Sequence, residues 1–234
     1  MRMSRRTSLR WNDALDRWVP PALRDSWLFA RAARSMYGDL PIPIDELKER
    51  AFTLSPTEYG DFYRSLQTRF EQGDTDLTPE SLDAVVGSVV GDTVLDVACG
   101  KGFLASILAR HHRVVGVDVA LATGDRAIRH TGAILCEANI ERLPFGDESF
   151  DTVVSTHTLE HVQHLGVALA ELRRVAAKRV VVVVPRQRPY RVTFNPHIHF
   201  FPYQFSVLAW TGTDRPYRCE LAGGDWLYVE EQTG

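Results

Sequence analysis

The chain has 234 residues, of which 44% are apolar and 24% are charged, and its formal net charge is −3. These values are typical of a globular protein with a sizeable core. The charge gives no overall reason to expect a nucleic acid or a membrane as partner. No apolar run approaches the about 20 residues of a transmembrane helix.

The cysteines and the N-terminal residues bear on the compartment. The chain has an odd number of cysteines, and none of them are spaced as Cys-x-x-Cys: Cys99, Cys136 and Cys219. This pattern favours reduced thiols in a cytoplasmic protein. The first ten residues hold four arginines but no apolar stretch of the kind that a secretory signal contains. We interpret this segment as a solvated terminus, with a functional basic arm as the alternative.

Residues 1–75 are predicted to form a helical N-terminal domain. Apolar residues recur at helical spacing, and Pro20, Pro21 and Gly38 interrupt them. Large aromatic residues such as Trp18 and Trp27 either pack this domain or line a substrate pocket. A polar linker around residues 72–76 marks the predicted boundary, so the second domain covers residues 76–234.

The second domain alternates helical and strand patterns, which predicts an α/β fold with a mostly parallel sheet and helices on both faces. The run of five valines at Val180–Val184 is typical of a strand that is buried on both faces. The predicted strands are Val94–Val97, Val114–Val117, Ala133–Cys136, Phe150–Ser155, Val180–Val184 and a closing hairpin formed by Arg218–Leu221 and Trp226–Glu230.

A glycine turn follows the first predicted strand. Gly100-x-Gly102-x-x-Ala105 fits the dinucleotide-binding pattern, and Asp118 follows Gly100 by 18 residues at the end of the next strand. A carboxylate at the carboxyl end of a parallel strand can accept both hydrogen bonds of a ribose diol. These residues predict an adenosine-containing ligand, and by themselves they do not separate NAD from other adenosine ligands.

Three further motifs make the pattern more specific. Asn139-Ile-Glu-Arg-Leu-Pro-Phe145 is followed by Ser149-Phe-Asp-Thr-Val-Val-Ser155 and by Thr158-Leu-Glu-His-Val162. With Asp96 and the glycine turn, they make residues 93–184 resemble the class I S-adenosylmethionine (SAM)-dependent methyltransferases, in particular those acting on small molecules. The resemblance implies a Rossmann-like sheet of seven strands in the order 3-2-1-4-5-7-6, with the seventh strand antiparallel.

The resemblance also implies roles for single residues. The glycine turn would hold the methionine part of SAM, and Asp118 would bind the ribose. Asn139 stands where the family usually carries Asp, and Ala98 replaces the first glycine of the family motif. The implied cofactor-binding residues are Asp96, Ala98, Cys99, Gly100, Gly102, Asp118, Val119, Asn139, Ile140, Ser155 and Thr156.

Histidine is the side chain best suited to act as a base near neutral pH. His157 and His161 directly follow the fourth predicted strand, where the methyl acceptor is expected. We predict His157 as the catalytic base and His161 as a second candidate, for which a structural role is the alternative. His164, His197 and His199 are further candidates. No metal is expected, because no third ligand accompanies the His197-x-His199 pair.

The sequence therefore predicts an enzyme that transfers a methyl group from SAM to a small organic acceptor, with oxygen favoured as the acceptor atom. The N-terminal domain would cover the acceptor site. The alternatives are an NAD-dependent oxidoreductase that uses the same glycine turn, a catalytically silent SAM-binding protein and an RNA methyltransferase that uses the arginine-rich N-terminus. Neither a membrane nor a nucleic acid is expected as partner, and the oligomeric state stays open.

Overall fold

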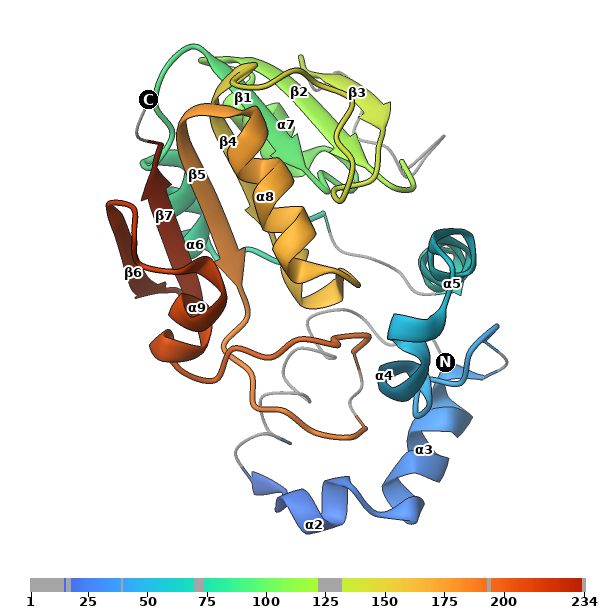
Figure 1. Cartoon of the computed structure of the whole chain (residues 1–234). Coiled ribbons are helices and arrows are strands. Elements are labelled where there is room, and N and C mark those ends of the chain that lie inside the picture. The colour runs from blue at the N-terminus through green and yellow to red at the C-terminus, as the bar shows by residue number, and fades with distance from the viewer. Residues whose placement is uncertain are drawn as a thin grey trace. The chain divides into compact units, whose positions relative to one another are not determined.

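The computed structural model describes residues 15, 18–38, 40–69, 74–121, 132–192 and 195–232. The chain divides into two compact units. Unit 1 comprises residues 1–73 and 187–200, and unit 2 comprises residues 74–186 and 201–234. The four arginines among the first ten residues lie outside the described residues. Figure 1 shows the elements of both units.

Unit 1 is helical in its described part. Its elements are α2 (Pro21–Arg24), α3 (Trp27–Tyr37), α4 (Leu47–Arg50), η1 (Ala51–Thr53) and α5 (Pro56–Arg69). Ser26 caps α3 by accepting a hydrogen bond from the backbone N–H of Phe29, and Gly38 ends α3 with a φ of 63°. Val192 and Ile198 belong to the same hydrophobic core as Phe62 and Leu47. The segment 187–200 is thus an integral part of unit 1.

Unit 2 contains one seven-stranded sheet in the order β3-β2-β1-β4-β5-β7-β6. Strands β1 to β5 are parallel, whereas β7 is antiparallel to both β5 and β6. This confirms the predicted fold class and strand order. The strands are β1 (Thr93–Val97), β2 (Arg113–Asp118), β3 (Ile134–Glu137), β4 (Phe150–Thr156), β5 (Ala176–Val184), β6 (Tyr217–Ala222) and β7 (Asp225–Glu231).

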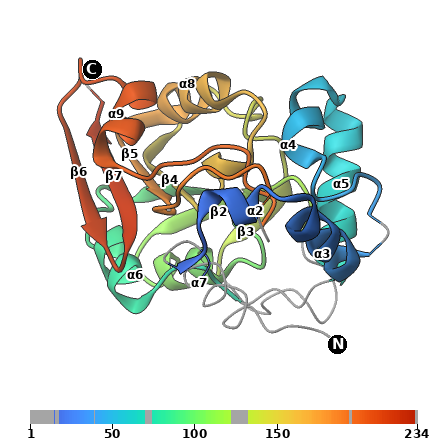
Figure 2. The same cartoon turned by 90° about the horizontal axis from the view of Figure 1, so that it is seen from below.

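Helices cover both faces of this sheet. Figure 2 shows α8 (Leu165–Val175) and α9 (Gln204–Thr211) on one face, and α6 (Pro79–Val86) and α7 (Phe103–Leu108) on the other. A short 3-10 helix, η3 (Leu159–His161), follows β4. The valines of β5 alternate between two cores: Val180 and Val182 pack on the α8 side, and Val181 packs on the α6 and α7 side. The five-valine run therefore fills both layers at once.

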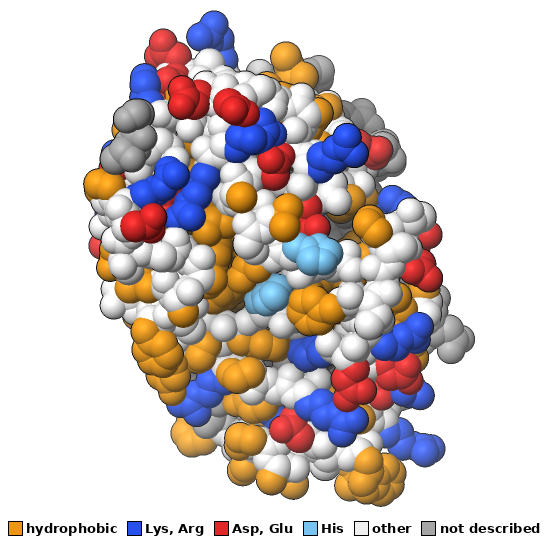
Figure 3. All heavy atoms as spheres, in the orientation of Figure 1, with side chains coloured by type: hydrophobic (Ala, Val, Ile, Leu, Met, Phe, Trp, Pro, Cys, Tyr) orange, Lys and Arg blue, Asp and Glu red, His pale blue; other side chains and the backbone are white. Residues whose placement is uncertain are grey.

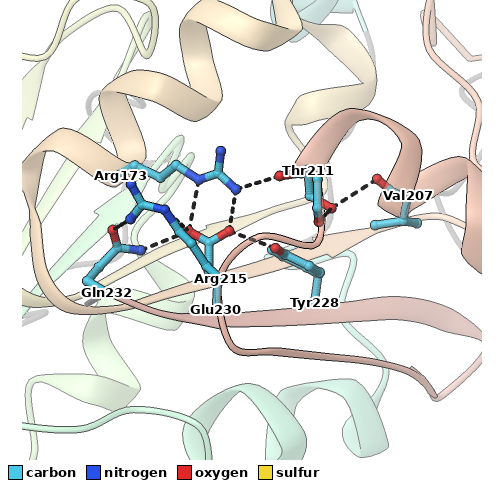
Figure 4. Close-up of polar contacts among 8 residues, drawn as sticks. Arg173, Val207, Thr211, Arg215, Tyr228, Glu230 and Gln232 are labelled. Carbon is cyan, nitrogen blue, oxygen red and sulfur yellow. Dashed lines mark hydrogen bonds and ion pairs between the residues drawn. The ribbon is translucent and has the colours of Figure 1, made fainter.

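A buried ion-pair network joins α8, α9 and β7 (Figure 4). Glu230 is fully buried, and the guanidinium of Arg173 donates to both of its carboxylate oxygens. Tyr228 donates its hydroxyl to Glu230 over 2.7 Å, and Arg173 also donates to the carbonyl oxygen of Thr211 over 2.6 Å. A buried carboxylate needs such partners, because its desolvation is otherwise uncompensated. The network fixes the antiparallel end of the sheet.

The two units differ in charge. Unit 1 contains fourteen Lys and Arg residues against ten Asp and Glu residues, whereas unit 2 contains thirteen against twenty. On the face of the molecule drawn in Figure 3, basic and acidic side chains are interspersed. Among the described residues, no helix is both long enough and apolar enough to cross a membrane.

Candidate cofactor and methyl-transfer site

The glycine turn directly follows β1 and has an unusual backbone. Ala98, Gly100 and Gly102 all have a positive φ, of 63°, 54° and 84°. The turn is closed by a hydrogen bond of 2.8 Å from the N–H of Gly102 to the carbonyl oxygen of Cys99. A Cβ added to Gly100 would meet no atom of the described residues within 4 Å. The backbone therefore borders open space at Gly100, as a turn that holds a ligand requires.

Asp96 lies inside the sheet just before this turn. Its side chain is 1% exposed, and the nearby backbone N–H of Ala105 favours its ionised form. Its Oδ2 has no hydrogen-bond partner among the described residues. Burial raises the pKa of Asp96 to about 7, against the opposing effect of the Ala105 N–H. A cationic ligand near this carboxyl group would favour its ionised form.

Asp118 ends β2 and faces the glycine turn. Its Oδ2 accepts the N–H of Gly100 over 2.9 Å, and its Oδ1 accepts the N–H of Ala120 over 2.9 Å. Burial raises the pKa of Asp118, although both N–H donors oppose this shift. Each carboxylate oxygen keeps a second lone pair, so the group can still accept from a diol. Val119 follows it with 45% of its surface exposed.

The end of β3 lies next to Asp118, because the N–H of Ala138 donates to the carbonyl oxygen of Asp118 over 2.9 Å. This contact places Asn139 and Ile140 on the same edge of the sheet. The side-chain oxygen of Asn139 accepts the N–H of Glu141 over 2.9 Å. Ile140 packs against the core on the α8 side. One lone pair of the Asn139 oxygen is therefore already used within the chain.

Ser155 and Thr156 end β4, beside β1 in the register that pairs Val97 with Ser155. Ser155 is 1% exposed, and its Oγ has no hydrogen-bond partner in the described part of the chain. A buried hydroxyl without a partner costs free energy, so it is a natural place for a ligand contact. Together with Asp96, it leaves two unsatisfied polar atoms near the carboxyl end of the parallel strands.

His157 follows β4 and is enclosed by two carboxylates. Its Nε2 lies 3.2 Å from Oδ2 of Asp225, and its Nδ1 lies 3.6 Å from Oε1 of Glu160. His161 lies further along, with its Nε2 3.8 Å from the same Oε1 of Glu160. Asp225 was not among the predicted site residues. Its only signal in the sequence is its position directly after Gly223-Gly224. The catalytic roles of His157 and His161 stay predictions.

The structure thus brings the predicted cofactor-binding residues together at one edge of unit 2. They come from the carboxyl ends of β1, β2, β3 and β4, where open α/β sheets bind their ligands. Of the other candidate histidines, His164 pairs its Nδ1 with Glu141 over 2.8 Å, and His197 and His199 belong to unit 1. The absence of a metal stays a prediction.

Comparisons with known proteins agree with this geometry. Residues 95–184 match the family model described as "Methyltransferase domain". The chain is 32% identical over 146 residues to the ubiquinone/menaquinone biosynthesis C-methyltransferase UbiE of Cupriavidus necator, covering 55% of this chain and 56% of UbiE. UbiE of Burkholderia mallei is 33% identical over 141 residues, which cover 52% and 53%. The chain thus spans about half the length of the curated relatives that it matches.

Solved structures show the same fold. One is a SAM-dependent methyltransferase of Thermotoga maritima, described as a possible histamine N-methyltransferase, with a TM-score of 0.50 at 17% identity. The match covers 66% of this chain and 88% of the Thermotoga chain. The PH0226 protein of Pyrococcus horikoshii has a TM-score of 0.52 at 17% identity, with coverages of 68% and 95%. At this identity the likeness shows the fold alone.

Proposed function

The chain carries a class I SAM-dependent methyltransferase domain, and from this premise we propose that it is an enzyme that methylates a small organic acceptor. The main support is the pair of buried polar atoms without partners beside the open glycine turn, Asp96 Oδ2 and Ser155 Oγ. Such atoms fit a polar, cationic cofactor better than an apolar one.

When bound, SAM would supply an electrophilic methyl group on a positively charged sulfonium, and the leaving group of the in-line transfer would be the neutral thioether of S-adenosylhomocysteine. The residues of the chain would hold this donor. Asp118 would accept the ribose hydroxyls, Ile140 would cover the adenine, and the turn around Gly100 would hold the methionine part. Ser155 and Thr156 would lie beside the transferable methyl group. Alignment of the two reactants and exclusion of water would supply most of the rate enhancement.

We propose a small molecule as the acceptor, in preference to a nucleic acid. Unit 2 carries twenty acidic against thirteen basic residues, and such an excess repels a phosphate backbone. UbiE is a carbon methyltransferase by name, whereas the sequence motifs of this chain favour oxygen as the acceptor atom. The assignment of oxygen as the acceptor atom therefore stays a prediction.

Calorimetry with SAM, its demethylated product S-adenosylhomocysteine and NAD tests the proposal. We expect binding of SAM and of S-adenosylhomocysteine, and none of NAD. Binding of NAD alone would favour the oxidoreductase, and binding of neither would refute the cofactor assignment. Labelled methyl-SAM with a panel of phenols, amines and carbon acids then reports the acceptor atom by the chemical shift of the new methyl group. Transfer to RNA alone would refute the small-molecule acceptor.

A further inference from the structure

His157 lies between η3 and β7 at the edge of unit 2. It is the first residue after β4, it has a φ of 51°, and its backbone N–H donates to the carbonyl oxygen of Val183 over 2.9 Å. Its ring reaches two different elements. Glu160 comes from η3, and Asp225 is the first residue of β7, which lies on the far side of β5.

We propose that His157 is a positioning residue whose ring bridges Glu160 and Asp225 and thereby holds the turn after β4 against the start of β7. The turn includes Ser155 and Thr156, which the proposed function places beside the transferable methyl group. The effect on methyl transfer rests on that proposed function, whereas the bridge itself does not.

Burial favours such a bridge. The side chain of Glu160 is 1% exposed, and those of His157 and Asp225 are 13% and 16% exposed. A carboxylate that is withdrawn from water to this extent requires a nearby positive charge or a set of donors. The two contacts are ion pairs and not hydrogen bonds, since Nε2 has no hydrogen-bond partner among the described residues and 3.6 Å is too long for one at Nδ1. The imidazolium form of His157 places one positive charge within 4 Å of both carboxylates, so a single charge serves both acids.

The surrounding charges favour this protonated form. Burial opposes the charge, but the carboxylates of Asp225 and Glu160 outweigh it and raise the pKa of His157 to about 9. A further titratable group among the described residues of this cluster is His161, whose Nε2 lies 3.8 Å from Oε1 of Glu160. An imidazolium has no lone pair left to accept a proton. The geometry therefore favours positioning over the role of base.

The left-handed backbone of His157 agrees with a turn that is fixed from several sides. A non-glycine residue in this region persists only where its surroundings hold it there. The Val183 carbonyl holds the backbone, and the two carboxylates hold the ring. Thr158 closes the same turn by donating its hydroxyl to the carbonyl oxygen of Thr156 over 3.0 Å.

The decisive measurement is the titration of His157 in the intact wild-type protein by NMR of labelled histidine, with His157→Gln used to assign its signal. We expect His157 to stay an imidazolium at pH 7.5 and to titrate near pH 9. A neutral ring at pH 7.5 would overturn the proposal. This measurement needs no activity, so it stands even if the protein fails to bind SAM and the proposed function is refuted.

Asp225→Asn gives a second, independent test. Loss of one carboxylate should lower the pKa of His157 by at least about one unit, which corresponds to a tenfold change in its proton affinity. In an active enzyme, kcat should fall at alkaline pH as His157 loses its proton, and Asp225→Asn should move this fall to lower pH. His111→Gln, at an exposed site, is the control and should change neither titration nor pH profile.

A base would behave in the opposite way. If His157 accepted a proton from the acceptor, kcat/KM would rise with pH as the ring became neutral. Asp225→Asn would then extend this rise to lower pH. A rise of this kind that disappears in His157→Gln would overturn the positioning role.

Discussion

The backbone N–H of Gly100 donates a hydrogen bond of 2.9 Å to Oδ2 of Asp118, so the glycine turn after β1 is tied to the end of β2. The same carboxylate is the predicted ribose ligand. A single side chain therefore shapes the turn and would also contact the cofactor, and its loss should affect both.

Asp118→Ala should weaken binding of S-adenosylhomocysteine by about 100-fold or more. Hydrogen bonds to a charged group each contribute about 1.5–3 kcal/mol, and the variant loses those to the ribose as well as those to Gly100 and Ala120. Calorimetric titration measures the change. Glu137→Ala is the matched control, because Glu137 is the exposed register partner of Asp118 on β3. Equal affinities of Asp118→Ala and wild type would remove the ribose assignment.

Gly100→Ala should weaken cofactor binding far more than it destabilises the protein. The added Cβ meets no atom of the described part of the chain within 4 Å, so the main cost to the folded state is the strain of a positive φ, about 1 kcal/mol. In the complex the methyl group would occupy space that the cofactor needs. Affinity for S-adenosylhomocysteine and the thermal midpoint are measured together.

Gly132→Ala is the control for this strain. Gly132 also has a positive φ, 72°, but it precedes β3 and therefore lies at the opposite end of the parallel strands. Among the described residues, its Cβ would contact Ala109 alone, at 3.4 Å. We expect Gly132→Ala to lose about as much stability as Gly100→Ala, but to bind S-adenosylhomocysteine with unchanged affinity. If both variants bind as the wild type does, the cofactor does not border Gly100.

Ala98→Gly should stabilise the protein by up to about 1 kcal/mol. Ala98 has a φ of 63°, which costs an L-residue about 1–2 kcal/mol, and the greater freedom of glycine in the unfolded chain offsets part of the gain. For a protein of this size, this predicts a rise in Tm of about 2–4 °C. Ala105→Gly within α7 should instead destabilise by about 1 kcal/mol. A lower Tm for Ala98→Gly would contradict the strain at this position.

Arg173→Met should destabilise unit 2 by about 3 kcal/mol, because it leaves Glu230 buried without its main counterion. Adding Glu230→Gln should recover about 1 kcal/mol or more, since it removes the unpaired charge. Denaturant unfolding gives both values. Glu220→Gln, which breaks an exposed ion pair with Arg218 at 3.5 Å, should change stability by less than about 0.5 kcal/mol.

The same network predicts a pH dependence. Burial opposes ionisation of Glu230, but the hydrogen bonds from Arg173, Tyr228 and Gln232 outweigh it and lower its pKa. A carboxyl group with a lowered pKa contributes stability above its ordinary value of 4.5, and this stability is lost as the pH falls through the lowered value. Wild type should therefore lose more stability than Glu230→Gln below about pH 4.5. If the stability of wild type and of Glu230→Gln fell in parallel below about pH 4.5, the ionised Glu230 would not be stabilising the fold.

Much of the fold could be predicted because its strands carry strong local patterns. Val180–Val184 is apolar on both faces, and a parallel strand between two helical layers satisfies such a run. The resemblance then supplied the strand order, which hydrophobic periodicity alone does not contain. Residues 187–200 had no such pattern, because Val192 and Ile198 are buried by helices that lie more than a hundred residues earlier in the chain.

The site was predictable where a residue follows a strand, since strand ends converge on one edge of a parallel sheet. Asp118 was predicted in this way, whereas the resemblance supplied the predicted roles of Asp96, Asn139 and Ser155. Asp225 was not, because only the antiparallel insertion of β7 beside β5 brings it to that edge. The environment of His157 was equally hidden, since its two carboxylates come from different elements.

The chain passes from one unit to the other three times, after residues 73, 186 and 200. A truncation at residue 73 would therefore not yield a clean catalytic fragment. It would leave Val192 and Ile198 with no core to enter. Exchange of unit 1 between related proteins would need two grafts made together, one at the N-terminus and one between β5 and α9. Changes in these two segments are thus expected to depend on each other during evolution.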